Sequence, residues 1–292
     1  MSLPKTFKRA VFKEAGAALT IEEVVLTTLD KGEILVKVEA CGVCYSDIFA
    51  QQNVMGGGFS PLVPGHELIG RVAAVGSGIS RWNIGDRIGA GWHGGHDYAE
   101  YCKIRSEAAV RVPEHIDAAK YAPILCAGMT VFNSLRHMDI PAGSTVAVQG
   151  LGGVGHLAVQ YANKLGYRVV AISRGSEKEE WARKLGAHEY VDASKNSPGE
   201  ALQKLGSASL VLATAPTAES ITPLLKGLGL GYGISVQSWP CGHATDSEEA
   251  IEFTELQSID CIVEKFPLEK ANDALDAMLK GTVRFRAVIT MD

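Results

Sequence analysis

The pattern of apolar and polar residues changes once along the chain. Between residues 7 and 112, short apolar stretches are separated by turns, and in residues 33–40 apolar and charged side chains alternate with the period of two that predicts half-buried strands. After Pro113 the apolar residues recur at helical spacing, and from residue 145 strands and helices are predicted in turn. This change predicts an α/β protein with two domains of different architecture and a junction near residue 127.

The second half of the chain is predicted to alternate between helices and strands. The predicted helices cover residues 121–136, 179–186, 218–229 and about 268–280, and the predicted strands cover residues 189–193, 209–215 and 234–239. Gly281 follows the last helix as a C-cap, and a closing strand comes after it.

Residues 145–178 have the pattern of one strand–helix–strand unit with a glycine turn inside it. The turn, residues 150–155, has the spacing G-x-G-x-x-G, and its candidate cofactor-binding residues are Gly150, Gly152, Gly153, Val154 and Gly155. The first glycine permits a tight turn, the second lets the backbone approach a pyrophosphate, and the third lets the helix pack closely on the strand. Phosphates suit the free N–H groups at the helix start. Such turns also occur without ligands, but this context predicts a dinucleotide site.

The residue at the end of the second strand of this unit predicts the kind of dinucleotide. An NAD site usually has Asp or Glu there, to bind the ribose hydroxyls. This chain has Ser173, followed by Arg174 and, one turn later, Lys178. A hydroxyl and two cations suit a 2′-phosphate, so NADP(H) is predicted in preference to NAD(H). The alternative is that both cations are solvated surface charges.

Composition excludes several classes of partner. The 292 residues are 46% hydrophobic and carry a formal net charge of -5, which argues against nucleic acid or an anionic membrane as the main partner. No apolar stretch is long enough for a membrane span, and the first residues show no secretory signal. Six scattered cysteines do not form a disulfide framework, so we expect a cytoplasmic protein.

Two thiols, an imidazole and a carboxylate form a second candidate site. Cys44, His66, Glu67 and Cys126 are the side-chain types that zinc prefers. Cys126 is equally compatible with an apolar core, and His66 with a structural histidine. The residues alone therefore leave metal binding open.

Several motifs together resemble the zinc-dependent alcohol dehydrogenases of the medium-chain dehydrogenase/reductase superfamily. The stretch GHELIGRVAAVGSGI is similar to that family's zinc signature. The other motifs follow the family's order over nearly the whole chain: CGVCYSD, APILCAGMTVFNSL, VQGLGGVG, WPCGHATDSEEAIEF and FPLEKANDALDAMLKGTVRFRAVIT. The resemblance implies a GroES-like β-rich catalytic domain over residues 1–127, completed by residues 264–292, and a Rossmann domain over residues 128–263.

The resemblance also implies roles for the candidate residues. Cys44, His66 and Cys126 would be ligands of one catalytic zinc, and Glu67 an alternating ligand. Asp47 would orient His66, and Ser46 would pass on the hydroxyl proton. Arg286 matches a basic residue that touches the cofactor phosphates. Trp92 and His93 would line the substrate cleft.

The chain departs from the family in four places. Tyr45 stands where many relatives have a basic residue near the pyrophosphate, and Phe49 stands where many have the histidine that ends the proton relay. No cluster of four cysteines lies between GWHGGH and YAEY, so we expect no structural zinc. After residue 229 only LGYG precedes the predicted strand at 234–239, so a strand and a linker of the Rossmann domain are missing and the domain is shortened.

The predicted function is oxidoreduction between an alcohol and an aldehyde or ketone, with NADP(H) or NAD(H) and zinc. Two alternatives remain at this point: a non-catalytic or repurposed member of the family that retains zinc or cofactor, and a zinc-free quinone or enoyl reductase on the same scaffold. The expected partner is a small-molecule substrate, with no nucleic acid or membrane, and a homodimer is possible.

Overall fold

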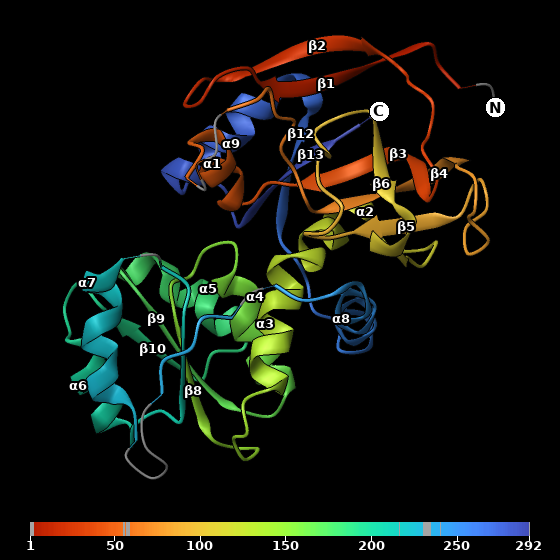
Figure 1. Cartoon of the computed structure of the whole chain (residues 1–292). Coiled ribbons are helices and arrows are strands. Elements are labelled where there is room, and N and C mark those ends of the chain that lie inside the picture. The colour runs from red at the N-terminus through yellow and green to blue at the C-terminus, as the bar shows by residue number, and fades with distance from the viewer. Residues whose placement is uncertain are drawn as a thin grey trace. The chain divides into compact units, whose positions relative to one another are not determined.

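The computed structural model describes residues 3–54, 56, 59–215, 217–229, 235–239 and 241–291, and they form two compact units (Figure 1). The first unit comprises residues 1–129, 241–256 and 260–292, and the second comprises residues 130–240 and 257–259. The N-terminal part and the C-terminal end of the chain therefore fold together. Residues 241–256 belong to the first unit, whereas the predicted boundary assigned them to the Rossmann domain. The division into a catalytic domain and a Rossmann domain at the predicted boundaries stays a prediction.

The described residues of the first unit form a mixed sheet of seven strands. Its order is β12-β13-β3-β4-β5-β7, and β6 also pairs with β3. The strands are β3 Glu33–Gly42, β4 Leu68–Val75, β5 Arg87–Ala90, β6 Tyr101–Arg105, β7 Ala109–Arg111, β12 Val263–Pro267 and β13 Arg286–Thr290. The pairing of β13 with β3 joins the last strand of the chain to an early one. This β-rich unit and the parallel sheet of the second unit confirm the predicted fold class.

A two-stranded antiparallel sheet and a helix surround one core of this unit. Strands β1 Thr6–Phe12 and β2 Leu19–Val25 pair along their whole length, and buried residues of β1 share a core with helix α9 Ala271–Lys280. Gly281 ends α9 in a left-handed conformation, as its position predicted, with φ of 64°. The helix α8 Ala244–Leu256 belongs to the same unit.

The second unit contains a parallel sheet with the strand order β10-β9-β8-β11. The strands are β8 Thr145–Gln149, β9 Arg168–Ser173, β10 Glu189–Asp192 and β11 Leu210–Ala213. The helices that follow them in the chain are α4 Gly155–Lys164, α5 Glu179–Lys184, α6 Pro198–Lys204 and α7 Ala218–Ile221. The two central strands read as continuous apolar runs because both of their faces are buried.

Three predicted elements differ from the structure. The strand predicted at 234–239 is wrong for residues 235–239, which form no strand and leave Val236 78% exposed; Ile234 and residues 230–233 lie outside the described residues. The helix predicted at 218–229 ends at Ile221, and Thr222–Gly227 form a 3-10 turn because Pro223 lacks the N–H of a regular helix.

The helix predicted at 121–136 is also interrupted. It consists of α2 Ala118–Tyr121, a 3-10 turn Ala122–Leu125 and α3 Ala127–Arg136. The interruption falls at Cys126, whose φ and ψ of -129° and -73° are not helical. The apolar pattern continues through this point, so only the backbone dihedral angles reveal the break.

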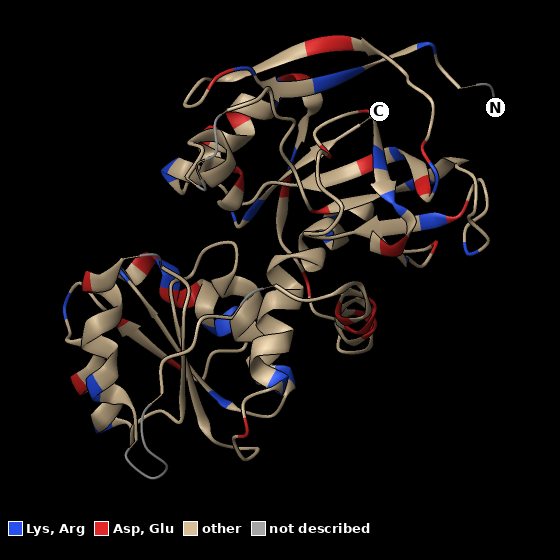
Figure 2. Ribbon diagram, viewed as in Figure 1, with Lys and Arg blue, Asp and Glu red and all other residues tan. Residues whose placement is uncertain are grey.

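Charged residues of both signs occur along the ribbon of each unit (Figure 2). On the two-stranded sheet, Arg9 of β1 pairs with Glu22 of β2 at 2.7 Å, and Lys8 pairs with Glu269 at 2.9 Å. These pairs are partly or largely exposed, so each contributes little to stability. Among the described residues, no helix is both long and apolar enough to cross a membrane.

Candidate metal centre and cofactor turn

Four side chains that lie far apart in the sequence meet in the first unit. One ligand atom from each of Cys44, His66, Glu67 and Cys126 lies within 4.8 Å of the others. Cys44 follows β3, His66 and Glu67 immediately precede β4, and Cys126 occupies the break before α3. The structure therefore brings together all four of the candidate zinc ligands.

The two thiols lie side by side. The Sγ atoms of Cys44 and Cys126 are 4.0 Å apart, and the hydroxyl of Ser46, the first residue of α1 Ser46–Gln51, lies 3.4 Å from Cys44 Sγ. The hydrogen bond with Cys126 and the positive charges of His66 and Arg286 hold the pKa of the Cys44 thiol well below its usual range. Thiolate is the form that binds metals.

Asp47 fixes the orientation of the histidine. Its carboxylate lies 3.3 Å from His66 Nδ1 and accepts hydrogen bonds from the backbone N–H of Cys44 at 2.9 Å and of Gly65 at 3.2 Å. The hydroxyl of Tyr98 donates a fourth contact at 2.9 Å. Because Asp47 is buried and held on several sides, it leaves His66 little freedom to rotate.

The opposite ring nitrogen of His66, Nε2, lacks a partner in the described part of the chain. Nε2 is buried and has no hydrogen-bond partner among the described residues, although the Cys44 thiol is near. Burial lowers the pKa of His66, but the contacts with Asp47 and Cys44 outweigh it and raise this pKa to about 11. A buried, unpartnered nitrogen that points to two sulfurs and a carboxylate fits a tetrahedral zinc ion.

Glu67 is held in the cluster by an arginine. Its carboxylate is fully buried, and both oxygens accept hydrogen bonds from Nη2 of Arg286 on β13. Burial raises the pKa of Glu67 to about 7, although the Arg286 charge opposes this rise. Gly42 makes room for the carboxylate, since a Cβ there would lie 1.7 Å from Glu67 Oε2. In the described structure Arg286 therefore binds Glu67, and its contact with cofactor phosphates stays a prediction.

Aromatic side chains flank the cluster. The ring of Trp92 meets His66 edge-on at 5.1 Å and is half-exposed, and the ring of His93 stacks on that of His243 at 5.6 Å. Tyr45 and Phe49, two of the departures from the family, are half-exposed and pack edge to face at 5.5 Å. Phe49 has no proton to pass, so this side chain offers no step after Ser46.

The glycine turn of the second unit has the geometry of a phosphate site. It joins β8 to α4, and the cap residue of α4, Val154, has no side-chain hydrogen bond to the helix start. Gly150 has a positive φ of 94°, and a Cβ on Gly155 would lie 1.8 Å from Gly150 O, so both positions require glycine. A Cβ on Gly152 would meet no atom of the other described residues within 4 Å, its chain neighbours apart. Gly152 therefore leaves open the space through which a pyrophosphate would approach.

The segment after β9 is fixed by the neighbouring strand. Ser173 ends β9 opposite Asp192 of β10, and Asp192 Oδ1 accepts the backbone N–H of Gly175 at 2.9 Å and both the N–H and the hydroxyl of Ser194. The hydroxyl of Tyr190 donates to Gly175 O at 2.5 Å. Arg174 lies inside this anchored segment, and Lys178 ends the 3-10 turn that follows it.

Comparison with known proteins identifies the family. The chain matches the alcohol dehydrogenase GroES-like domain over residues 30–121 and the zinc-binding dehydrogenase family over residues 153–275. It is 59% identical to the alcohol dehydrogenase patD of Penicillium expansum, over 99% of this chain and 98% of that protein. It is 55% identical to the alcohol dehydrogenase notN of Aspergillus sp. (strain MF297-2), over the full length of both.

The chain is a zinc-type alcohol dehydrogenase of the medium-chain superfamily. Its fold agrees with that of the cinnamyl alcohol dehydrogenase SbCAD4 from Sorghum bicolor, with a TM-score of 0.84 and 25% identity over 98% of each chain. The predicted enzyme class and the predicted reaction, between an alcohol and an aldehyde or ketone, are confirmed. The alignment with patD spans 336 positions, more than the 292 residues present, so the relative has segments without a counterpart in this dehydrogenase.

Three residues of the dehydrogenase's site were not predicted from the sequence. Tyr98 and Gly42 support Asp47 and Glu67, and a third cysteine, Cys241, lies against Cys126. Tyr98 belongs to the YAEY motif, and a tyrosine at this position next to a predicted strand is typical of a core residue, so the sequence did not indicate its contact with Asp47. No signal in the sequence places Cys241 near the cluster, because 114 residues separate it from Cys126.

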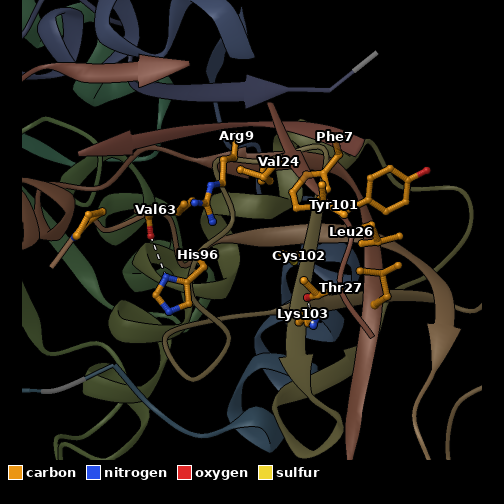
Figure 3. Close-up of a pocket in the computed structure, with 14 residues that line it drawn as sticks. Phe7, Arg9, Val24, Leu26, Thr27, Val63, His96, Tyr101, Cys102 and Lys103 are labelled. Atoms are coloured by element: carbon orange, nitrogen blue, oxygen red, sulfur yellow. Dashed lines mark hydrogen bonds between the residues drawn. The ribbon is translucent and has the colours of Figure 1, made fainter. Parts of the chain in front are cut away.

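A cavity of about 520 Å³ also lies in the first unit of the dehydrogenase, apart from the cluster (Figure 3). It is lined by residues of β1, β2 and β6 and by His96, whose Nδ1 lies 3.0 Å from the Val63 carbonyl oxygen. None of the four clustered ligands lines it. Its cations are engaged within the protein, since Arg9 binds Glu22 and Lys103 binds Thr27 and the Thr28 carbonyl.

Proposed function

We propose that this alcohol dehydrogenase holds one catalytic zinc on Cys44, His66 and Cys126, with Glu67 as an exchangeable ligand, and that it prefers NADP(H). The observation that carries the zinc assignment is the buried Nε2 of His66, which lacks a partner and faces the other three ligand atoms. When bound, zinc supplies a Lewis acid that polarises the oxygen of the alcohol or carbonyl, and the nicotinamide exchanges a hydride with the adjacent carbon.

The side chains of the cluster divide the remaining work. Asp47 holds the Nδ1 proton of His66 and so directs Nε2 to the metal. Arg286 neutralises Glu67 and holds it beside the ligand position that substrate would occupy. Ser46 is next to Cys44 and passes the hydroxyl proton to solvent or to the cofactor ribose, because Phe49 cannot receive it.

Zinc content and a single variant test this assignment. We expect one zinc per chain by mass spectrometry of protein purified without added metal, and no second zinc, because no cluster of four closely spaced cysteines exists. Cys44→Ser should lose both the zinc and the oxidoreductase activity. Cys261→Ser, which changes a buried thiol outside the ligand set, is the matched control. Full activity of a zinc-free protein would overturn the proposal.

The NADP preference rests on the end of β9. Ser173 offers a hydroxyl where a carboxylate would repel a 2′-phosphate, and Asp192 of the adjacent strand is engaged with Gly175 and Ser194. Arg174→Ala should raise the KM for NADPH with little change in kcat, because a 2′-phosphate lies far from the reacting carbon. Arg183→Ala, on α5, is the control. Equal use of NADH by the unmodified enzyme would refute the preference.

We further infer that the substrate is a small alcohol or carbonyl compound, and that residues 1–127 with 264–292 act as the catalytic domain and residues 128–263 as the cofactor domain. A homodimer and a cytoplasmic location remain proposals. The net charge of -5 and the six scattered cysteines are consistent with the cytoplasmic location. Sedimentation analysis and imaging of a tagged protein test them.

A further inference from the structure

A third thiol lies beside one of the proposed zinc ligands. Cys241 precedes α8, in the same unit as the cluster, and its Sγ donates a hydrogen bond to the Cys126 carbonyl at 3.7 Å. Its thiol also hydrogen-bonds with the side chain of Cys126. Cys126 is therefore in contact with two thiols, Cys44 on the ligand side and Cys241 on the other.

Exposure distinguishes the two neighbours. Cys241 is partly exposed, whereas the other five cysteines are buried. It also lies outside the group of four mutually close ligand atoms, so zinc does not need it. Cys241 is thus an accessible thiol in contact with the thiol of a proposed ligand, Cys126. In this arrangement a small oxidant can reach the sulfur of Cys241, and the sulfur of Cys126 can then form a disulfide with it.

We propose that Cys126 and Cys241 form an oxidisable dithiol that a peroxide converts into a disulfide. The disulfide itself follows from the contact between the two thiols. Its consequence, the loss of zinc from the cluster, rests on the proposed ligation by Cys126. No rearrangement between the two units is involved, because both residues belong to the first.

The reaction balances in two steps. The Cys241 thiol gives two electrons to the peroxide, so that the O–O bond breaks, one water leaves and Cys241 becomes a sulfenic acid. The Cys126 thiolate then attacks that sulfur, the S–O bond breaks, and hydroxide leaves as the S–S bond forms. Cys126 then no longer offers a thiolate, so the cluster keeps only Cys44, His66 and Glu67. A thiol reductant breaks the S–S bond by thiol–disulfide exchange, returns both cysteines to thiols and is itself oxidised to a disulfide.

The competing disulfide is Cys44–Cys126. Its sulfurs are 4.0 Å apart, a spacing compatible with shared coordination of one metal ion. Both of those residues are only 9% exposed, so a peroxide reaches their thiols less readily than the thiol of Cys241. The exposure of Cys241 is the reason for preferring the Cys126–Cys241 bond.

Peptide mapping of the zinc-loaded enzyme tests the proposal. The protein is treated with hydrogen peroxide, free thiols are blocked with iodoacetamide, and trypsin plus a glutamate-specific protease cut it without reduction. Four glutamates between Cys241 and Cys261 (Glu248, Glu249, Glu252 and Glu255) allow these two cysteines to be separated. We expect a peptide pair that links Cys126 to Cys241, and zinc release, followed with a chromogenic chelator, at the same rate.

Cys241→Ser separates cause from consequence. Serine keeps the size of the side chain at a partly exposed position, so the variant should fold, which circular dichroism checks. It should lose the linked peptide and slow the release of zinc, whereas Cys261→Ser should behave like the unmodified enzyme. Zinc release that is unchanged in Cys241→Ser, or a map that shows Cys44 linked to Cys126, would overturn the proposal. A Cys126–Cys241 bond that forms without zinc release would retain the dithiol and refute the ligand role of Cys126.

Discussion

At the scale of single residues, the proposed metal cluster depends on side chains outside the proposed ligand set. Asp47 binds His66 Nδ1 and is itself held by Tyr98 and by two backbone N–H groups, and Arg286 holds Glu67. Each of these buried groups would cost free energy if its partner were missing. The ligands are therefore oriented by the folded protein before any metal binds.

Asp47→Asn tests this orientation. The amide keeps the size of the side chain but cannot hold the Nδ1 proton of His66 with a negative charge. We expect zinc affinity to fall by roughly 10- to 100-fold, the usual effect of losing a partner of a metal ligand. Competition with a chelator measures the affinity. Asp117→Asn, which removes a partly exposed carboxylate at the start of α2, is the control and should leave zinc affinity unchanged.

Zinc binding should also release protons. Burial lowers the pKa of His66 but Asp47 and Cys44 raise it to about 11, so the ring of the metal-free protein is protonated at neutral pH. Zinc binds only the neutral ring, so the bound state holds fewer protons and zinc affinity should rise with pH across the neutral range. Calorimetry in buffers of different ionisation enthalpy counts the protons. A binding enthalpy that does not depend on the buffer would contradict this prediction.

At the scale of secondary-structure elements, breaks in regular structure place the chemistry. The non-helical backbone of Cys126 interrupts an otherwise helical stretch before α3, and the turn between β8 and α4 presents an uncapped helix start. In the same way, Cys44, His66 and Glu67 lie just outside the ends of β3 and β4. Strands and helices fix these positions, and the residues at their ends carry the site.

Two glycine substitutions in the β8–α4 turn should affect different properties, one the stability of the protein and the other its affinity for NADPH. Gly155→Ala puts a Cβ 1.8 Å from Gly150 O, a backbone atom that cannot move aside, so we expect a loss of stability of about 1–3 kcal/mol. The Cβ of Gly152→Ala would meet no described residue within 4 Å beyond its chain neighbours, so the stability of this variant should be unchanged while its NADPH affinity falls. Denaturant unfolding and fluorescence titration measure the two quantities. Unchanged NADPH binding by Gly152→Ala would argue against the turn as the phosphate site.

At the scale of the whole molecule, the proposed zinc ligands and the proposed phosphate turn lie in different units. All four proposed zinc ligands belong to the first unit, and the glycine turn with Ser173 belongs to the second. The described part of the second unit's sheet has four strands and ends at β11, whose side chains are only partly buried. Each unit should therefore respond to its own ligand.

Removal of zinc should lower the thermal stability of the first unit. A ligand that binds only the folded state at 100 times its Kd adds about 2.7 kcal/mol to stability. For a unit of this size each kcal/mol shifts Tm by roughly 2–4 °C, so a chelator should lower Tm by several degrees. Calorimetry with and without chelator, and with zinc added back, measures the shift. A Tm that does not respond to the chelator would show that the cluster holds no metal that matters for stability.

The sequence by itself determined the local features of this dehydrogenase. Local features depend only on residues that are close together in the sequence. Patterns of period two and 3.6 indicate the strands and helices, and the positions of glycine indicate the turn at residues 150–155 and the cap at Gly281. Family motifs identified Cys44, His66, Glu67 and Cys126 for the same reason, because each motif is a short continuous stretch. The strand predicted at 234–239 is wrong over residues 235–239 because an apolar run reports β propensity but not whether a neighbouring strand is there to pair with it.

Only the tertiary structure decided the contacts between distant stretches. The pairing of β13 with β3 brings Arg286 to Glu67 across 219 positions, and Cys241 reaches Cys126 across 115. The same folding places the hydroxyl of Tyr98 on Asp47. Such contacts depend on how the chain closes its long loops and on which buried polar groups must find partners, and no local pattern encodes either.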